Sequence, residues 1–269
     1  MKSYIQRRLL QFLPIIFGIC ILNFILIQIA PGDLAEVVAG ESGQGEDGAN
    51  SKEFVDDLRK SFGLNLPLYV QLFVYFKKLA SLDFGFSFRY GVPVAELIAS
   101  RIGATILLGL TSLLIAVTAG VLLGVLCSKN PNGRFDRAVS SITAFCYSIP
   151  VFWLALMLVV IFGVKLAWLP IGGMREFAQA PGTFASVLDV LTHLILPAGT
   201  LAIYSTAVYT RFTRAAMVDV LQEDYIRTAR SKGLSEKTVY FDHALRNAFL
   251  PVLTLVGMSF GELLGQHRD

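Results

Sequence analysis

The residues best placed to do chemistry in this chain are charges in a polar stretch, Glu223 to Pro251, that lies between two apolar runs. At its start come Glu223, Asp224, Arg227, Arg230 and Lys232. On a helical wheel Glu223, Arg227 and Arg230 share one face, and Leu221 and Tyr225 share the opposite face. Glu223 also stands in the favourable i,i+4 order before Arg227. The pattern predicts an amphipathic helix that could dock another protein, although a solvated loop between two spans would look similar.

The residues after these charges predict a sharp turn. Gly233 can adopt a positive φ and so can end the first helix. Ser235 is a good N-cap for a second helix, which would enter the membrane near Ala248. The stretch is therefore predicted to be a helix, a glycine turn and another helix.

Catalytic patterns are missing from the sequence. The histidines His193, His243 and His267 have no nucleophile at a fixed local spacing. The cysteines Cys20, Cys127 and Cys146 form neither a C-x-x-C pair nor a mixed cluster with histidine, so a metal site is not expected. There is also no G-x-x-x-x-G-K-[ST] loop to cradle ATP phosphates. We expect no enzyme and no cofactor in this chain, so energy for any work must come from a partner.

The elements that position the polar stretch are apolar helices. Charged residues make up only 16% of the chain, against about a quarter in soluble domains, which places it in a bilayer. The formal charge of +3 does not suggest a nucleic-acid partner. Spans need about 20 apolar residues, and lipid forces their backbone to be helical. The prediction is an all-α, polytopic membrane bundle with five spans, at about Leu9–Ala30, Ala104–Cys127, Ala138–Gly163, Leu191–Tyr209 and Ala248–Gly265.

Lysine and arginine set the expected orientation, because they concentrate in short cytoplasmic connections. They are frequent in the N-terminal tail, in the turn 128–137 and in the loop 211–247, and sparse after the third span. We therefore expect a cytoplasmic N-terminus, a cytoplasmic loop 211–247 and an external loop 31–101. Within the external loop, a helical pattern from Glu53 is closed by Gly63, and another begins after Pro67.

One acidic residue, Glu262, lies in the fifth apolar run. An ionisable group at membrane depth is a candidate for a substrate pathway. Glu262 is also close enough to the end of the run to reach the interface, so the alternative is an ordinary interfacial side chain.

The polar stretch resembles the cytoplasmic EAA-type loop of ABC-transporter permeases, most closely in the dipeptide/oligopeptide branch. The resemblance rests on Asp224-Tyr225, Arg227-Thr228-Ala229-Arg230, Lys232-Gly233-Leu234, His243-Ala244-Leu245-Arg246-Asn247-Ala248 and Leu250-Pro251. Arg227 replaces the glutamate of the general pattern and the gap to Leu-Pro is longer, as in the peptide branch. The match continues along almost the whole chain, for example at Ser148-Ile149-Pro150 and Trp168-Leu169-Pro170.

The resemblance implies a permease subunit of an ATP-driven importer of peptides or similar small solutes, in a bacterial-type inner membrane. It implies two ATP-binding subunits, which bind the ATP, a second permease subunit and an extracytoplasmic substrate-binding protein as partners. A coupling helix would dock into an ATPase subunit. The residues implied to couple are Glu223, Asp224, Tyr225, Arg227, Thr228, Ala229, Arg230, Lys232, Gly233 and Leu234.

The family continues into a sixth span, whereas this sequence departs from the pattern at Gln266 and ends at Asp269. The expectation is one transmembrane domain over 1–269 that lacks the last span, and a truncated, non-transporting permease is one alternative. Another is a self-contained secondary transporter or channel, which would need ionisable residues in several spans. No residue selects among a dipeptide, an oligopeptide, nickel, glutathione or another solute.

Overall fold

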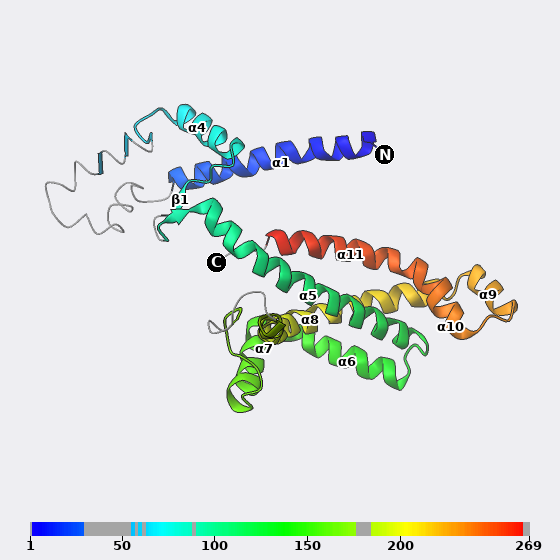
Figure 1. Ribbon diagram of the computed structural model, residues 1–269. Coiled ribbons are helices and arrows are strands. Elements are labelled where there is room, and N and C mark those ends of the chain that lie inside the picture. Colours follow the sequence, from blue (N-terminus) through cyan, green and yellow to red (C-terminus); the bar gives the residue numbers. More distant parts are fainter. Residues whose placement is uncertain are drawn as a thin grey trace. The chain divides into compact units, whose positions relative to one another are not determined.

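The computed structural model describes residues 2–29, 55–56, 59–60, 63–87, 90–175 and 184–265. The chain divides into two compact units, Met1–Arg101 and Ile102–Asp269. The boundary falls inside a long helix, α5 (Val94–Ser128), shown in green in Figure 1. The fold is helical almost throughout, which confirms the predicted all-α class.

The first unit contains α1 (Lys2–Ile29) and α4 (Leu68–Ala80), which begins after Pro67 as predicted. The rings of Phe17 and Phe76 stack with centroids 4.6 Å apart, and Gln28 Nε2 donates to Gln71 Oε1 at 2.8 Å. Gly63 has a φ of +67° and closes the preceding turn, as its sequence position predicted. Phe54, Leu58 and Phe62 of the predicted helical pattern lie outside the described residues.

A small hairpin departs from the all-helical expectation. β1 (Phe86–Ser87) pairs antiparallel with β2 (Val92–Pro93), with Phe86 opposite Pro93. Gly91 supports the turn with a φ of +67°, and its N–H donates to the carbonyl of Ser87 at 2.8 Å. Two-residue strands are too short to give an alternating pattern, so the sequence offered no signal for them.

The second unit holds the rest of α5 followed by a series of helices (Figure 1). They are α6 (Arg134–Ser148), α7 (Val151–Leu158), η1 (Val159–Lys165), α8 (Phe184–Val220), α9 (Asp224–Ser231), α10 (Glu236–Thr238), η2 (Val239–Ala244) and α11 (Leu245–Gly265). Within the described residues, four helical segments are long and apolar enough to cross a membrane. They are Leu10–Ile29, Val94–Ser128, Phe184–Val220 and Glu236–Gly261, in agreement with four of the predicted spans.

The third predicted span, Ala138–Gly163, is not one straight helix. It consists of Arg134–Ser148 and Val151–Lys165, which meet at a bend of 99°. Pro150 lies at the break and Ile149 before it is extended, with a φ of −79° and a ψ of 129°. Proline disfavours the helical conformation in the residue before it, which explains the bend. A hydropathy window cannot detect it, because both halves are helical and together pass as apolar.

Close packing of α5 against α8 organises the second unit. A Cβ on Gly120 would lie 2.5 Å from Tyr209 Cβ, and a Cβ on Gly124 would lie 2.6 Å from Thr213 Cβ. These two glycines therefore let the helix backbones approach, as small residues do between membrane helices. The adjoining core contains Val125, Met217 and residues of the polar stretch.

The predicted loop 211–247 is mostly helical. α8 continues three turns beyond the predicted end at Tyr209, because a helix does not stop where its apolar part ends. α9 and the helices that lead into α11 occupy most of the rest. The stretch is thus a mostly helical connection between α8 and α11 (Figure 1).

Candidate docking site

Helix α9 forms the start of the predicted docking stretch. Glu223 is its N-cap, with an extended φ of −67° and ψ of 147°, so it does not belong to the helix. The predicted i,i+4 partnership of Glu223 with Arg227 is therefore replaced. Arg227 Nη1 lies 3.4 Å from Asp224 Oδ1 within the first turn. Asp224 also suits this end of the helix, where the macrodipole favours negative charge.

The buried face of α9 consists of Ile226 and Ala229. Both residues join the core of the second unit, and Ile226 is fully buried. The predicted apolar face, Leu221 and Tyr225, is only partly confirmed. Leu221 precedes the helix and packs against the core, whereas Tyr225 is exposed. Tertiary contacts with η2 and α11 decide which face of α9 is buried. A helical wheel shows only the angular positions of residues on one helix, so it could not indicate these contacts.

The glycine turn has the predicted form. Gly233 has a φ of +77°, its N–H donates to the carbonyl of Arg230 at 2.9 Å, and Leu234 N–H donates to the carbonyl of Ala229 at 3.4 Å. This pair of bonds is a Schellman motif. Ser235 then caps α10, since its Oγ accepts from the N–H of Thr238 at 3.3 Å. Helix, glycine turn and second helix are confirmed.

An ion pair closes the turn. Arg230 Nε donates to Glu236 Oε1 at 3.0 Å, and Nη2 donates to Oε2 at 3.4 Å. The hydrogen bond with Glu236 raises the pKa of Arg230 above its usual value. Arg230 therefore stays cationic at any pH at which the protein works. The two residues lie on opposite sides of Gly233, so their contact spans the turn between α9 and α10, but because both side chains are exposed it contributes at most about 1 kcal/mol.

Two further contacts connect this turn to neighbouring helices. Asn247 Nδ2 in α11 donates to the hydroxyl oxygen of Tyr225 at 2.7 Å. Lys129, which follows α5, places its Nζ 5.8 Å from the ring centroid of Tyr240 in η2. The docking stretch is thereby tied to α11 on one side and to the end of α5 on the other.

The structure brings the predicted coupling residues together on one surface. All of them except Ala229 are exposed, and Ala229 is buried in the core beneath the helix. Glu262, the other candidate, belongs to the helical backbone of α11, but its side chain lies outside the described residues. Among the residues that the structure describes, no group of three His, Cys, Asp or Glu side chains could hold a metal ion.

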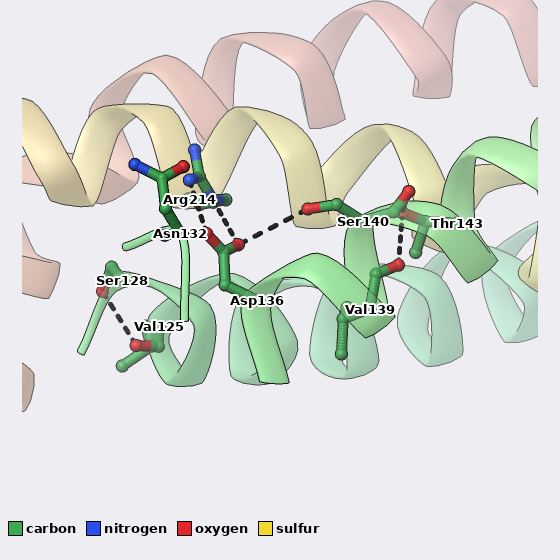
Figure 2. A network of polar contacts seen from close by, with 8 residues as sticks. All are labelled: Val125, Ser128, Asn132, Asp136, Val139, Ser140, Thr143 and Arg214. Atoms are coloured by element: carbon green, nitrogen blue, oxygen red, sulfur yellow. Dashed lines mark hydrogen bonds and ion pairs between the residues drawn. The ribbon is translucent and has the colours of Figure 1, made fainter. Parts of the chain in front are cut away.

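A charge pair near this surface was not predicted. Asp136, at the start of α6, has a side chain only 3% exposed, and Arg214 of α8 grips it with two hydrogen bonds of 2.5 and 2.6 Å (Figure 2). Asp136 also accepts from the N–H of Asn132 at 2.7 Å. Asp136 and Arg214 are 78 residues apart in sequence, so no local spacing could have indicated the pair.

These features define a multi-pass helical membrane protein with a structured polar loop between its last two described long helices. Comparison with known proteins agrees. Residues 120–267 match the model of the family described as binding-protein-dependent transport system inner membrane component. The oligopeptide transport system permease protein AppB of Bacillus subtilis (strain 168) is 39% identical over 267 residues, which cover 98% of this chain and 81% of the relative.

The di/tripeptide transport system permease protein DppB of Pseudomonas aeruginosa (strain UCBPP-PA14) is 40% identical over 278 residues, which cover 98% of this chain and 81% of the relative. The chain belongs to the family of inner membrane components of binding-protein-dependent transport systems, and is thus a permease subunit of an ABC importer. The family is one of transport permeases and not of enzymes.

Proposed function

We propose that this permease subunit imports peptides and that α9 with the Gly233 turn docks into an ATP-hydrolysing subunit. The observation that carries the proposal is the division of α9 into two faces. Ile226 and Ala229 fix the helix to the core, while the charged residues on its other side are exposed. A short, charged helix that is fixed to the core by its buried face is suited to a polar groove on a partner.

The contacts of α9 offer a route for force. A push on α9 reaches the core directly through the buried Ile226 and reaches α11 through the hydrogen bond between Tyr225 and Asn247. The backbone hydrogen bonds of Gly233 and Leu234, with the ion pair between Arg230 and Glu236, favour a single conformation of the turn. Closure of two ATPase subunits on ATP would thus move the spans of this chain and of a second permease subunit, and so switch the path between inward and outward openings.

The proposed orientation places α9 on the cytoplasmic side of the inner membrane, where ATP is available. It rests on the concentration of lysine and arginine in the N-terminal tail, the 128–137 turn and the 211–247 segment. A substrate-binding protein would deliver the solute from the opposite side. Two relatives named for oligopeptide and di/tripeptide transport favour peptides as the solute class.

The experiment is a co-purification from mild detergent. The tagged chain is expressed with an ATPase pair and a partner permease, and Gly233→Arg is compared with Gly233→Asn. Both variants place a side chain at a φ of +77°, which costs most residues about 1–2 kcal/mol, but asparagine tolerates this region. A Cβ at this position meets open space, so the first side-chain atom of either variant is accommodated.

We expect Gly233→Asn to recover the ATPase subunits as the native chain does, and Gly233→Arg to lose most of them while still inserting in the membrane. Recovery of the ATPase subunits at the native ratio by Gly233→Arg, together with undiminished peptide-stimulated ATP hydrolysis, would contradict the docking assignment.

A further inference from the structure

A cavity of about 450 Å³ lies between α6 and α8 in the second unit. Its volume is within the range of small-molecule sites. Its polar lining includes Ser140, Thr143, Tyr147, Thr210, Arg211 and Arg214. Nothing in the docking surface described above uses this cavity.

The polar lining comes from one face of each helix. Ser140, Thr143 and Tyr147 recur at the i, i+3 and i+7 positions of α6, and Thr210 and Arg214 are four residues apart on α8. Polar faces on membrane helices turn toward the bundle interior or a water-filled path, because lipid chains cannot solvate them. We therefore expect this cavity to face protein or water and not lipid chains.

Arg211 is the available cation of the cavity. Its guanidinium carbon lies 5.4 Å from the centroid of the Tyr147 ring, and that ring stacks on Tyr204 at 5.0 Å. Among the described residues, no acidic side chain forms an ion pair with Arg211. Arg214 is different, since Nε and Nη2 are committed to Asp136 (Figure 2). The guanidinium of Arg214 is thus neutralised by Asp136. The guanidinium of Arg211 lies over the ring of Tyr147, and its N–H donors remain available.

We propose that this cavity is a subsite for the carboxylate of a peptide during transport. Arg211 receives the carboxylate, since a guanidinium matches its two oxygens in a bidentate contact. Tyr147 holds the guanidinium in place from one side. The proposal rests on peptide import as the proposed function, and adds to it the chemical group that this chain recognises.

A lipid headgroup phosphate carries the same charge as a peptide carboxylate, and Arg211 is the first residue of the 211–247 segment that the proposed orientation places on the cytoplasmic side. The experiment below therefore includes an arm that detects a bound headgroup.

Binding to the assembled complex tests the subsite. The complex of this chain with its partner permease and ATPase subunits is purified in maltoside micelles, without phospholipid and without binding protein. The affinity for a labelled tripeptide with a free carboxylate is compared with that for its C-terminal amide. We expect the native complex to prefer the carboxylate at least tenfold, Arg211→Gln to reduce that ratio to about one, and Arg211→Lys to keep part of it. Arg134→Gln, an exposed position on α6, removes the same charge and should leave the ratio unchanged.

Equal affinity of the native complex for carboxylate and amide, or an undiminished ratio in Arg211→Gln, would overturn the subsite. Retention of phosphatidylglycerol that depends on Arg211, with peptide binding that does not, would assign the cavity to a headgroup and also overturn it. ATP-driven peptide uptake by the native complex in vesicles, with binding protein added, is measured in parallel. That uptake tests only the proposed function of peptide import. Failure of the subsite proposal can therefore be distinguished from failure of the proposed function.

Discussion

Single side chains decide how the polar end of this bundle is held together. Asp136 is almost fully buried, and its two oxygens receive Arg214 together with the N–H of Asn132. Ser140 Oγ also approaches it at 3.4 Å. Removing two charges from water is costly, and the excellent geometry of the pair offsets that cost. Loss of one member of the pair is therefore expected to destabilise the fold more than loss of both, because it leaves a buried charge without its partner.

We predict that Asp136→Asn lowers the free energy of unfolding by about 3 kcal/mol, because it leaves the partly buried Arg214 without its counter-charge. Chemical unfolding of the purified chain in detergent measures this. The matched control is the double variant Asp136→Leu with Arg214→Met, which removes both charges and should recover most of the loss. Equal losses in the single and double variants would show that the charge pair is not the cause.

Some features of single residues could be predicted from the sequence, and others could not. The conformation of Gly233 and the cap at Ser235 follow from local backbone chemistry, and both were predicted correctly. The contact between Asp136 and Arg214 depends on the packing of α6 against α8, so no local pattern indicates it. The cavity around Arg211 was missed for the same reason.

At the scale of elements, the approach of α5 to α8 depends on two glycines. The Cβ of an alanine at position 124 would lie 2.6 Å from Thr213 Cβ and 2.9 Å from the backbone of Thr210 and Arg214. The backbone of α8 cannot give way as a flexible side chain would. The helices must therefore separate to accept any side chain there.

Gly124→Ala is expected to destabilise the bundle by about 1–3 kcal/mol, the usual range for overpacking. Gly103→Ala is the matched control in the same helix, since its Cβ meets open space. Alanine is a better helix former than glycine, so this control should be neutral or stabilise by up to about 1 kcal/mol. Thermal unfolding in detergent compares the two variants. Equal effects of both substitutions would rule out close helix approach as the role of Gly124.

Helix boundaries were predicted less well than helix existence. Hydropathy located the apolar part of each span, but α5 and α8 extend past it, and Pro150 divides the third predicted span. The buried face of α9 was also predicted only in part, because Ile226 and Ala229 are buried by contacts that depend on the tertiary fold. Composition and hydrophobic periodicity predict where helices form. The bends of these helices and the faces that they bury depend on the helices packed against them.

At the scale of the whole molecule, the chain is a permease subunit that covers about four-fifths of the length of its relatives. The second unit contains both the docking stretch and the cavity around Arg211. The core cluster joins α5, α8, α9, η2 and α11, so a displacement of α9 has contiguous packing through which to act. This arrangement is the basis for coupling in the proposed mechanism.

The most direct test of the docking claim is a thiol cross-link from α9 to an ATPase subunit. Arg227→Cys places a thiol where the native side chain is 77% exposed, and Phe152→Cys provides an exposed control position on α7. The assembled complex is treated with a short bifunctional reagent, and the products are identified by mass spectrometry. We predict an Arg227→Cys product that joins this chain to the ATPase subunit, with no such product from Phe152→Cys. A fully assembled complex that gives no Arg227→Cys product with the ATPase subunit would contradict docking through α9.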